Sequence, residues 1–169
     1  MSQKIILIGY MGSGKSTLGE KLARELKVPF IDSDEVIEQI AKMDVSTIFK
    51  TQGEDVFRKM ESMFLESLIN IPAFVLSTGG GMPCFNNNME VLNELGNTIY
   101  LKNSSEGLAD RLMRAKSNRP LIEGKSETEL IQFIEENLIK REPFYTQATI
   151  TLELKDQGLI DVLKLIAEL

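Results

Sequence analysis

The fold is decided near the N-terminus, by the stretch Ile5-Ile6-Leu7-Ile8-Gly9-Tyr10-Met11-Gly12-Ser13-Gly14-Lys15-Ser16-Thr17. Its first residues form an uninterrupted apolar run of strand length, which is typical of a strand buried on both faces of a parallel sheet. The residues from Gly9 onward fit the pattern G-x-x-x-x-G-K-[ST] at each fixed position. Leu18, Leu22 and Leu26 then recur at helical spacing, so a helix is predicted over residues 15–27.

The residues of this loop suit the phosphate chain of a nucleotide. Glycines let the backbone curl until successive N–H groups point at phosphate oxygens, and the start of the helix adds the positive end of its dipole. Lys15 is expected to reach the β- and γ-phosphates, and the Ser16 hydroxyl to face Mg²⁺. The alternative, an ordinary glycine-rich turn, is disfavoured by the strand before it and the helix after it. The predicted nucleotide contacts are Gly12, Ser13, Gly14, Lys15, Ser16 and Thr17.

The rest of the chain alternates strands with helices. Apolar runs predict further strands at residues 28–31, 73–76, 98–101 and 148–152. Helical spacing and a capping box at Ser126 and Glu129 predict helices over residues 34–42, 53–70, 88–95, 105–114, 126–140 and 160–169. This alternation indicates an α/β fold with a parallel sheet covered on both faces. At 169 residues, the chain is expected to form a single domain spanning residues 1–169.

Composition excludes several classes of function. The chain has no His and one Cys, Cys84, which excludes histidine triads and intramolecular disulfides and disfavours a cysteine-based zinc site. A formal net charge of −6 disfavours a nucleic-acid partner. The apolar runs are too short to span a membrane, and the first residues lack the features of a signal peptide, so a cytoplasmic location without a membrane partner is expected. Catalysis must then depend on carboxylates, Lys, Arg, backbone amides or a carboxylate-bound metal.

Two carboxylates, Asp32 and Asp34, follow the second predicted strand. Ligands of open α/β sheets bind at this carboxyl edge of the strands. Asp32 is a candidate for holding Mg²⁺ or its waters, and Asp34 for accepting or orienting the proton of an attacking hydroxyl. The competing interpretation is that Ser33 or Asp34 only caps the next helix. The phosphate-binding loop one strand–helix unit earlier favours the functional interpretation.

Arg58 lies on a predicted helix with Glu54 four residues before it and Glu61 three residues after it. A carboxylate at either spacing can hold the guanidinium in one orientation, and a guanidinium held in this way can pair with a carboxylate substrate through two hydrogen bonds. Single arginines are nevertheless most often solvated surface residues.

Three other segments are candidates for the site. Gly79-Gly80-Gly81 follows the third strand and would let a ligand approach the backbone closely, or would simply form a flexible turn. Arg119 precedes a proline in a polar loop that could close over phosphates and exclude water, or be an ordinary surface loop. Arg141 lies beyond a candidate strand end.

Together these motifs resemble shikimate kinase, a family of small enzymes in the pathway to chorismate and the aromatic amino acids. The resemblance spans nearly the whole chain, and the combination of motifs is far more specific than the phosphate-binding loop alone. The segments that carry it are Gly9 to Thr17, Asp32-Ser33-Asp34, Gly53-Glu54 with Phe57-Arg58 and Glu61, Ser77 to Gly81, Arg119-Pro120-Leu121, and Arg141-Glu142-Pro143 with Tyr145.

The resemblance implies a P-loop, adenylate-kinase-like fold of three layers around a five-stranded parallel sheet. It implies transfer of the γ-phosphoryl group of ATP to the 3-hydroxyl of shikimate, giving shikimate 3-phosphate and ADP. It also implies a substrate-binding region at about residues 32–61, a lid at about residues 112–125, and a monomer.

Carried over by position, the resemblance assigns roles to the candidate residues. Asp34 would be the base, and Lys15 and Arg119 would stabilise the transferring charge, with Arg119 also contacting the nucleotide. Ser16 and Asp32 would serve Mg²⁺. The shikimate contacts would be Asp34, Arg58, Gly79, Gly80, Gly81 and Arg141, with the two arginines holding the carboxylate. A second lid arginine is either Arg111 or Arg114, and the adenine contacts are not assigned.

Two alternatives remain at this point. A related small-molecule kinase would act on gluconate or a nucleoside monophosphate, and would differ in its acceptor pocket. A nucleotide-binding module without catalysis, such as a degenerate kinase kept for regulation, is disfavoured because Lys15, Ser16, Asp32 and Asp34 are all present.

Overall fold

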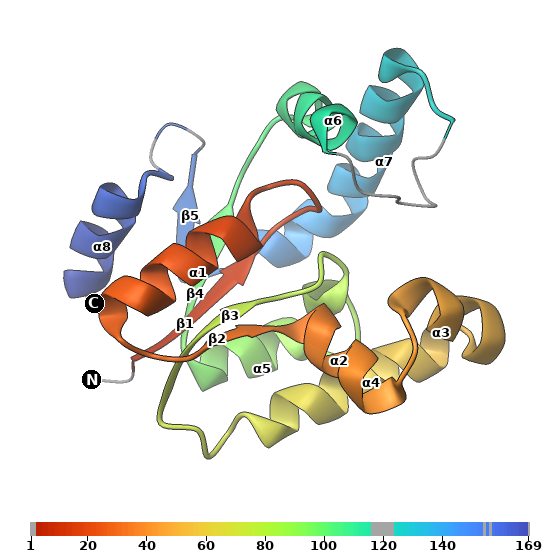
Figure 1. Cartoon of the computed structure of the whole chain (residues 1–169). Helices are drawn as coiled ribbons and strands as arrows, with labels where there is room; N and C mark the ends of the chain where they lie inside the picture. The colour runs from red at the N-terminus through yellow and green to blue at the C-terminus, as the bar shows by residue number, and fades with distance from the viewer. Residues whose placement is uncertain (1–2, 116–123, 154, 156, 169) are drawn as a thin grey trace.

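The structure is a computed structural model that describes residues 3–115, 124–153, 155 and 157–168. At its centre lies one parallel sheet with the strand order β2-β3-β1-β4-β5 (Figure 1). The strands are β1 (Gln3–Ile8), β2 (Phe30–Asp32), β3 (Ala73–Ser77), β4 (Asn97–Leu101) and β5 (Ile150–Leu152). The sheet confirms the predicted five-stranded α/β fold.

The position of β1 in the middle of the sheet places the phosphate-binding loop. Ile6 lies opposite Leu76 of β3 on one side and Thr98 of β4 on the other. The chain therefore continues from β1 toward one edge of the sheet through β2 and β3, and toward the other through β4 and β5. Ligands of open α/β sheets bind at such a switch point, outside the carboxyl ends of the strands.

The apolar run of β1 is continuous because both faces of the sheet are covered. Ile5 and Leu7 point to one face and pack with residues of α1 (Lys15–Leu26) and α8 (Leu159–Ala167). Ile6 and Ile8 point to the other face and pack with residues of α4 (Glu54–Ser67) and α5 (Asn88–Leu95). Each side chain of the run is at most 1% exposed. Burial on both faces requires a continuous apolar sequence rather than alternation.

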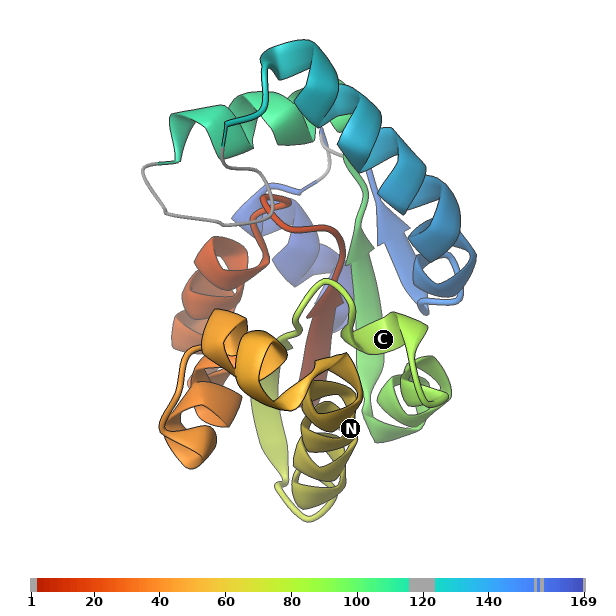
Figure 2. The same ribbon diagram turned by 90° about the vertical axis from the view of Figure 1, so that its right-hand side faces the viewer.

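The remaining helices flank the carboxyl edge of the sheet, where the phosphate-binding loop lies between two groups of them (Figure 2). On one side α6 and α7 pack against each other; on the other lie the short helices that follow β2. These elements are α2 (Ser33–Ala41), α3 (Val45–Gln52), η1 (Met82–Cys84), α6 (Ser105–Arg114) and α7 (Glu127–Tyr145).

The structure between β2 and β3 differs from the prediction in one additional helix and in the start of the next. The sequence analysis did not predict α3, a short helix rich in β-branched residues whose fully buried side chain is Ile48. It forms because Asp44 caps it by accepting a hydrogen bond from the Thr47 backbone, and because Phe49 packs on Phe57 with ring centroids 4.9 Å apart. The next helix begins at Glu54 rather than Gly53, since Gly53 has a φ of 88° and separates the two helices.

The helix predicted for residues 126–140 begins as expected but ends later. Ser126 and Glu129 form the predicted capping box. The prediction ended the helix before Pro143, but α7 continues to Tyr145. The fully buried Tyr145 side chain anchors this last turn in the core. Among the described residues, no helix combines the length and apolar character needed to cross a membrane.

Candidate functional site

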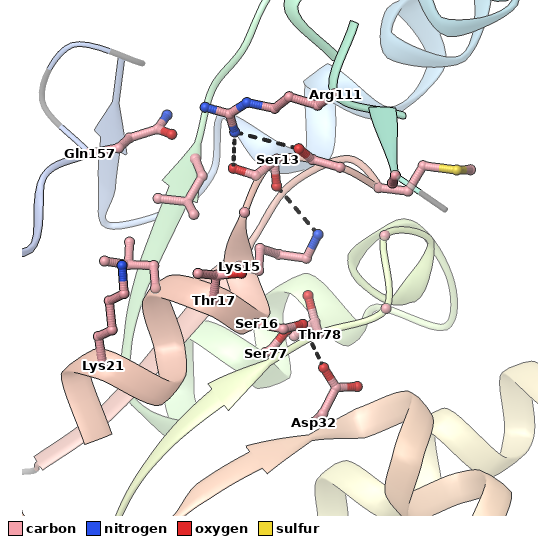
Figure 3. Close-up of a pocket in the computed structure, with 18 of the residues that line it drawn as sticks. Ser13, Lys15, Ser16, Thr17, Lys21, Asp32, Ser77, Thr78, Arg111 and Gln157 are labelled. Carbon is pink, nitrogen blue, oxygen red and sulfur yellow. Dashed lines mark hydrogen bonds between the residues drawn. The ribbon is translucent and has the colours of Figure 1, made fainter. Parts of the chain in front are cut away.

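A cavity of about 780 Å³ opens at the carboxyl edge of the sheet (Figure 3). It runs from the glycine loop after β3, across the phosphate-binding loop, to the start of α8. Its walls contain most of the predicted site residues within the described part of the chain, but Arg58, Gly81 and Arg141 are not among them. Among its lining residues are Gly12, Ser13, Gly14, Lys15, Ser16, Thr17, Asp32, Asp34, Gly79, Gly80, Arg111 and Gln157.

The phosphate-binding loop has the backbone that its glycines predict. Gly12 and Gly14 have φ angles of 81° and 97°, in the left-handed region that other residues rarely adopt. Lys15 is largely buried under the loop, where its Nζ donates to the carbonyl oxygens of Gly9 at 2.8 Å and Tyr10 at 2.9 Å. The ammonium group is thus held beside the curled backbone, where it adds positive charge to the amide groups.

Ser16 and Asp32, the two predicted metal-binding residues, meet at the mouth of the loop. The Ser16 hydroxyl donates to Oδ2 of Asp32 at 2.8 Å and lies 3.1 Å from the Ser77 hydroxyl (Figure 3). The other Asp32 oxygen, Oδ1, accepts from the Asp34 backbone N–H at 3.1 Å and so caps α2. The capping alternative named the wrong residue, since Asp32 rather than Ser33 or Asp34 caps this helix.

These two residues fit a magnesium ion bound mainly through phosphate and water. Mg²⁺ prefers hard oxygen ligands and commonly takes one or two from a protein in kinase sites. Within the described residues, no three His, Cys, Asp or Glu side chains gather as a metal cluster. One hydroxyl and one carboxylate beside the phosphate-binding loop agree with that pattern.

Asp34 lies in the first turn of α2 and lines the cavity. Burial raises the pKa of its carboxyl group, and the negative charge of Asp32 raises it further, while Lys15 opposes both effects. Gly79 packs against this carboxylate so closely that a methyl group at Gly79 would lie 2.5 Å from Oδ1. A raised pKa brings a carboxylate closer to the value that suits a general base.

Arg58 is held as the sequence predicts, by carboxylates on its own helix. Its Nη2 donates to Glu54 at 2.9 Å and its Nη1 donates to Glu61 at 2.8 Å. Phe85 lies over the guanidinium, with its ring centroid 4.1 Å from Cζ. Burial raises the pKa of Glu61 to about 7, although the charge of Arg58 lowers it.

Arg141 approaches the glycine loop from α7. Its guanidinium lies over the Tyr10 ring, with Cζ 5.1 Å from the ring centroid. Its Nη1 would lie 3.3 Å from a methyl group at Gly80. The guanidinium is therefore held between the phosphate-binding loop and the loop after β3.

The three glycines after β3 each face a different charged side chain. Gly79 faces Asp34, Gly80 faces Arg141, and Gly81 faces Arg58, whose Nη2 would lie 2.7 Å from a methyl group at Gly81. None of these three glycines has a positive φ. Space, rather than backbone conformation, explains why the loop carries no side chains.

The structure distinguishes the two arginines that the sequence left open. Arg111 reaches the phosphate-binding loop, where its Nη1 donates to the Ser13 carbonyl oxygen at 3.0 Å (Figure 3). Arg114 pairs with Asp110 at 2.9 Å and is mostly exposed. Arg119 and most of the predicted lid at residues 112–125 lie outside the described residues.

The sequence analysis also missed the end of the cavity farthest from the glycine loop. Gln157, Gly158 and Leu159 line it, after the carboxyl end of β5. The Gln157 side chain is fixed because Nε2 donates to the carbonyl oxygens of Lys102 at 2.8 Å and Leu152 at 2.9 Å. The rule that ligands bind at the carboxyl edge of the strands could have singled out this segment.

Comparisons with known proteins agree with this geometry. A sequence model of the family described as shikimate kinase matches residues 11–168. A shikimate kinase of Azobacteroides pseudotrichonymphae is 44% identical over 163 residues, covering 96% of each chain. One from Bacteroides fragilis is 47% identical over 145 residues, covering 86% of this chain and 81% of its own.

Solved structures show the same relationship. The crystal structure of shikimate kinase from Bacteroides thetaiotaomicron superposes with a TM-score of 0.91 at 42% identity, covering 98% of both chains. Shikimate kinase from Acinetobacter baumannii in complex with shikimate gives a TM-score of 0.87 at 35% identity, covering 98% of this chain and 93% of its own. A gluconokinase from Sinorhizobium meliloti, with a TM-score of 0.61 at 19% identity, shares the fold alone. The chain therefore belongs to the shikimate kinase family, whose enzymes phosphorylate shikimate with ATP.

Proposed function

We propose that this protein transfers the γ-phosphoryl group of ATP to the 3-hydroxyl of shikimate, with residue roles that follow from its geometry. The observation that carries the proposal is the continuity of one cavity from the phosphate-binding loop to Asp34 and the glycine loop. A phosphate donor and an alcohol acceptor bound in this cavity would meet beside a carboxylate. Phosphoryl transfer depends mainly on such positioning and on charge stabilisation.

On the acceptor side, Arg58 and Arg141 would bind the carboxylate of shikimate. Both guanidiniums face the glycine loop, at Gly81 and Gly80 respectively. Arg58 is held by Glu54 and Glu61, so its side chain loses little conformational freedom when it also pairs with the carboxylate of shikimate. With the carboxylate held there, the reacting hydroxyl would lie toward Asp34, which would orient it and accept its proton.

On the donor side, the loop from Gly12 to Thr17 would bind the phosphates through its backbone, and Lys15 would stabilise the charge on the transferring group. Ser16 and Asp32 would hold Mg²⁺, which, when bound, would neutralise part of the negative charge of the phosphates. For Arg119 we propose the charge-stabilising role that its sequence position implies. Arg111 would be the second arginine at the nucleotide, since it already lies on the loop.

The substrate assignment is tested by supplying ATP and Mg²⁺ with shikimate, gluconate or a nucleoside monophosphate and measuring ADP release. Turnover with shikimate alone is expected, because Arg58 and Arg141 both border the glycine loop at one end of the cavity, where they could pair with a compact carboxylate. Preference for gluconate or a nucleotide would replace this proposal, and no turnover with any acceptor would indicate a nucleotide-binding module. The Lys15→Ala variant is the matched negative control, since it removes the ammonium group of the phosphate-binding loop.

We also propose that residues 1–169 act as one domain and as a monomer, with small-molecule partners alone. Both arginines, the base and the phosphate-binding loop come from a single chain, so the site is built without a second copy. Light scattering coupled to gel filtration at assay concentrations tests the monomer. A dimer that persists on dilution would contradict it.

A further inference from the structure

Tyr145 is a buried polar residue to which the proposed mechanism gives no task. It is the last residue of α7 and has no exposed surface. Its hydroxyl donates a hydrogen bond to the carbonyl oxygen of Gly80, and its ring packs on Tyr100 with centroids 5.0 Å apart. A tyrosine that filled space alone would not need this bond, since burying an unpaired hydroxyl is costly and phenylalanine would fill the space equally well.

Gly80 lies at the junction of the two halves of the site. A methyl group there would lie 3.3 Å from Nη1 of Arg141, 3.4 Å from the Gly9 carbonyl oxygen and 3.4 Å from the Met11 backbone nitrogen. One side of this residue thus borders an arginine proposed to bind the acceptor, and another borders the phosphate-binding loop. A small displacement of Gly80 changes the distance between donor and acceptor.

Tyr145 and Arg141 lie one helical turn apart on α7, at the i and i+4 spacing that places two side chains on the same face. The turn between them contains Pro143, which cannot donate a backbone hydrogen bond. The contact between Tyr145 and Gly80 therefore joins the last turn of α7, which lacks one backbone donor, to the glycine loop. Burial also raises the pKa of the Tyr145 hydroxyl, so the group remains a donor across the working pH range.

We propose that Tyr145 is a positioning residue, whose hydrogen bond to Gly80 sets the glycine loop and Arg141 at the distance from the phosphate-binding loop that shikimate requires. The inference rests on the proposed function, because it assigns the carboxylate of the acceptor to Arg141. Tyr145 itself does not touch the substrate. Its effect reaches the acceptor through Gly80, whose carbonyl oxygen it binds, and through Arg141, which its hydroxyl also contacts.

The test compares Tyr145→Phe with Tyr100→Phe. The first variant keeps the ring stacked on Tyr100 and removes the bond to Gly80 together with the polar contact between the hydroxyl and Arg141. The second removes the hydroxyl of the neighbouring ring and leaves both interactions in place. For Tyr145→Phe the KM for shikimate is expected to rise about fivefold to tenfold, the usual effect of losing one buried hydrogen bond, with the KM for ATP changed less than about twofold. For Tyr100→Phe both constants are expected to stay within about twofold of the wild type.

A mutant cycle with Arg141→Lys separates positioning from a general loss of stability. If Tyr145 acts through Arg141, the double variant raises the KM for shikimate by clearly less than the product of the two single effects. Equal effects of Tyr145→Phe and Tyr100→Phe, a matching rise in the KM for ATP, or simple multiplication in the double variant each overturns the inference. If the wild type itself fails to phosphorylate shikimate, it is the proposed function that fails.

A measurement on the wild type covers the case in which Tyr145→Phe does not fold. The chain contains three tyrosines, so ring-labelled tyrosine gives few signals in an NMR spectrum, and Tyr10→Phe and Tyr100→Phe assign the third by elimination. The Tyr145 signal should shift when shikimate is titrated, and the midpoint of this shift should agree with the Kd for shikimate measured by calorimetry. The Tyr100 signal should shift less. An unmoved Tyr145 signal at saturating shikimate, or an equal movement of both, contradicts the inference.

Discussion

At the scale of single residues, Asp34 and Glu61 are both buried carboxylates with raised pKa values, but their surroundings suit different tasks. Asp34 lines the cavity beside the phosphate-binding loop, and no arginine in the described part of the chain pairs with it. Glu61 is fully buried and is not among the residues that line the cavity, and its Oε2 accepts a hydrogen bond from Arg58 at 2.8 Å. The first carboxylate is placed to act on a substrate, and the second to hold a residue that does.

Replacing Asp34 with Asn is expected to lower kcat by about a hundredfold or more, the usual contribution of a general base, and to change the KM for ATP by less than about twofold. The amide fills the same space but cannot accept the proton. Steady-state kinetics with shikimate measures this. Asp44→Asn is the matched control, because Asp44 caps α3 away from the site and Asn caps helices equally well. A near-normal kcat in Asp34→Asn would show that Asp34 only orients the hydroxyl.

Glu61 predicts a pH dependence in substrate binding. Its pKa is raised to about 7 from the ordinary 4.5, so the carboxylate is charged above about pH 7 and takes up a proton as the pH falls below it. The neutral form attracts Arg58 less, and the KM for shikimate should therefore rise on the acid side while the KM for ATP stays constant. In the Glu61→Gln variant, the KM for shikimate should be higher than in the wild type at every pH and should change little with pH. An unchanged acid-side rise in that variant would assign the titration to another group.

At the scale of elements, the loop between β3 and η1 brings three helices to one point. Asp34 comes from α2, Arg58 from α4 and Arg141 from α7, and each faces a different glycine of this loop. The absence of side chains from Gly79 to Gly81 lets these charged groups approach the backbone closely. A methyl group added at one of these glycines should therefore displace the charged side chain that faces it and leave the other two in place.

Gly79→Ala and Gly81→Ala should have different kinetic effects. The first places a methyl group 2.5 Å from Oδ1 of Asp34 and should mainly lower kcat, while the second places one 2.7 Å from Nη2 of Arg58 and should mainly raise the KM for shikimate. Each effect is expected to reach about tenfold to a hundredfold, since small misplacements of reacting groups are costly. Gly107→Ala in α6 is the control, because among the described residues only the Ser104 hydroxyl would lie within 4 Å of the added methyl group. The same effect from both loop variants would refute this division.

At the scale of the whole molecule, nucleotide binding links stability to the metal site. A ligand that binds only the folded protein raises its stability with concentration, and we expect ADP at about a hundred times its Kd to raise the Tm by about 5 °C or more. The rise should be smaller in EDTA than in Mg²⁺, because Ser16 and Asp32 would hold the ion against the phosphates. Thermal denaturation with and without each ligand measures it.

Asp32→Asn tests the metal assignment in the same experiment. Asn can replace Asp as the cap of α2, so the Tm without ligand should change little. The lost charge should remove most of the difference between Mg²⁺ and EDTA. A full magnesium effect in this variant would exclude Asp32 from the metal site.

The sequence predicted those parts of the site that depend on neighbours along the chain. The continuous run of β1 indicated a strand buried on both faces, and the spacing of Glu54, Arg58 and Glu61 on one helix predicted the observed ion pairs. The phosphate-binding loop was predictable because its glycines and its lysine act within a few residues of one another. In each case the periodicity of a single element determines which side chains meet.

Contacts between distant elements were decided only by the tertiary structure. Arg111 rather than Arg114 reaches the phosphate-binding loop because of how α6 packs, and the Gln157 segment lines the cavity because β5 ends beside it. The pairing of each glycine after β3 with one charged side chain, and the contact of Tyr145 with Gly80, join residues 23 to 65 positions apart. Local spacing carries no information about such pairs, because their distances depend on how whole helices pack on the sheet.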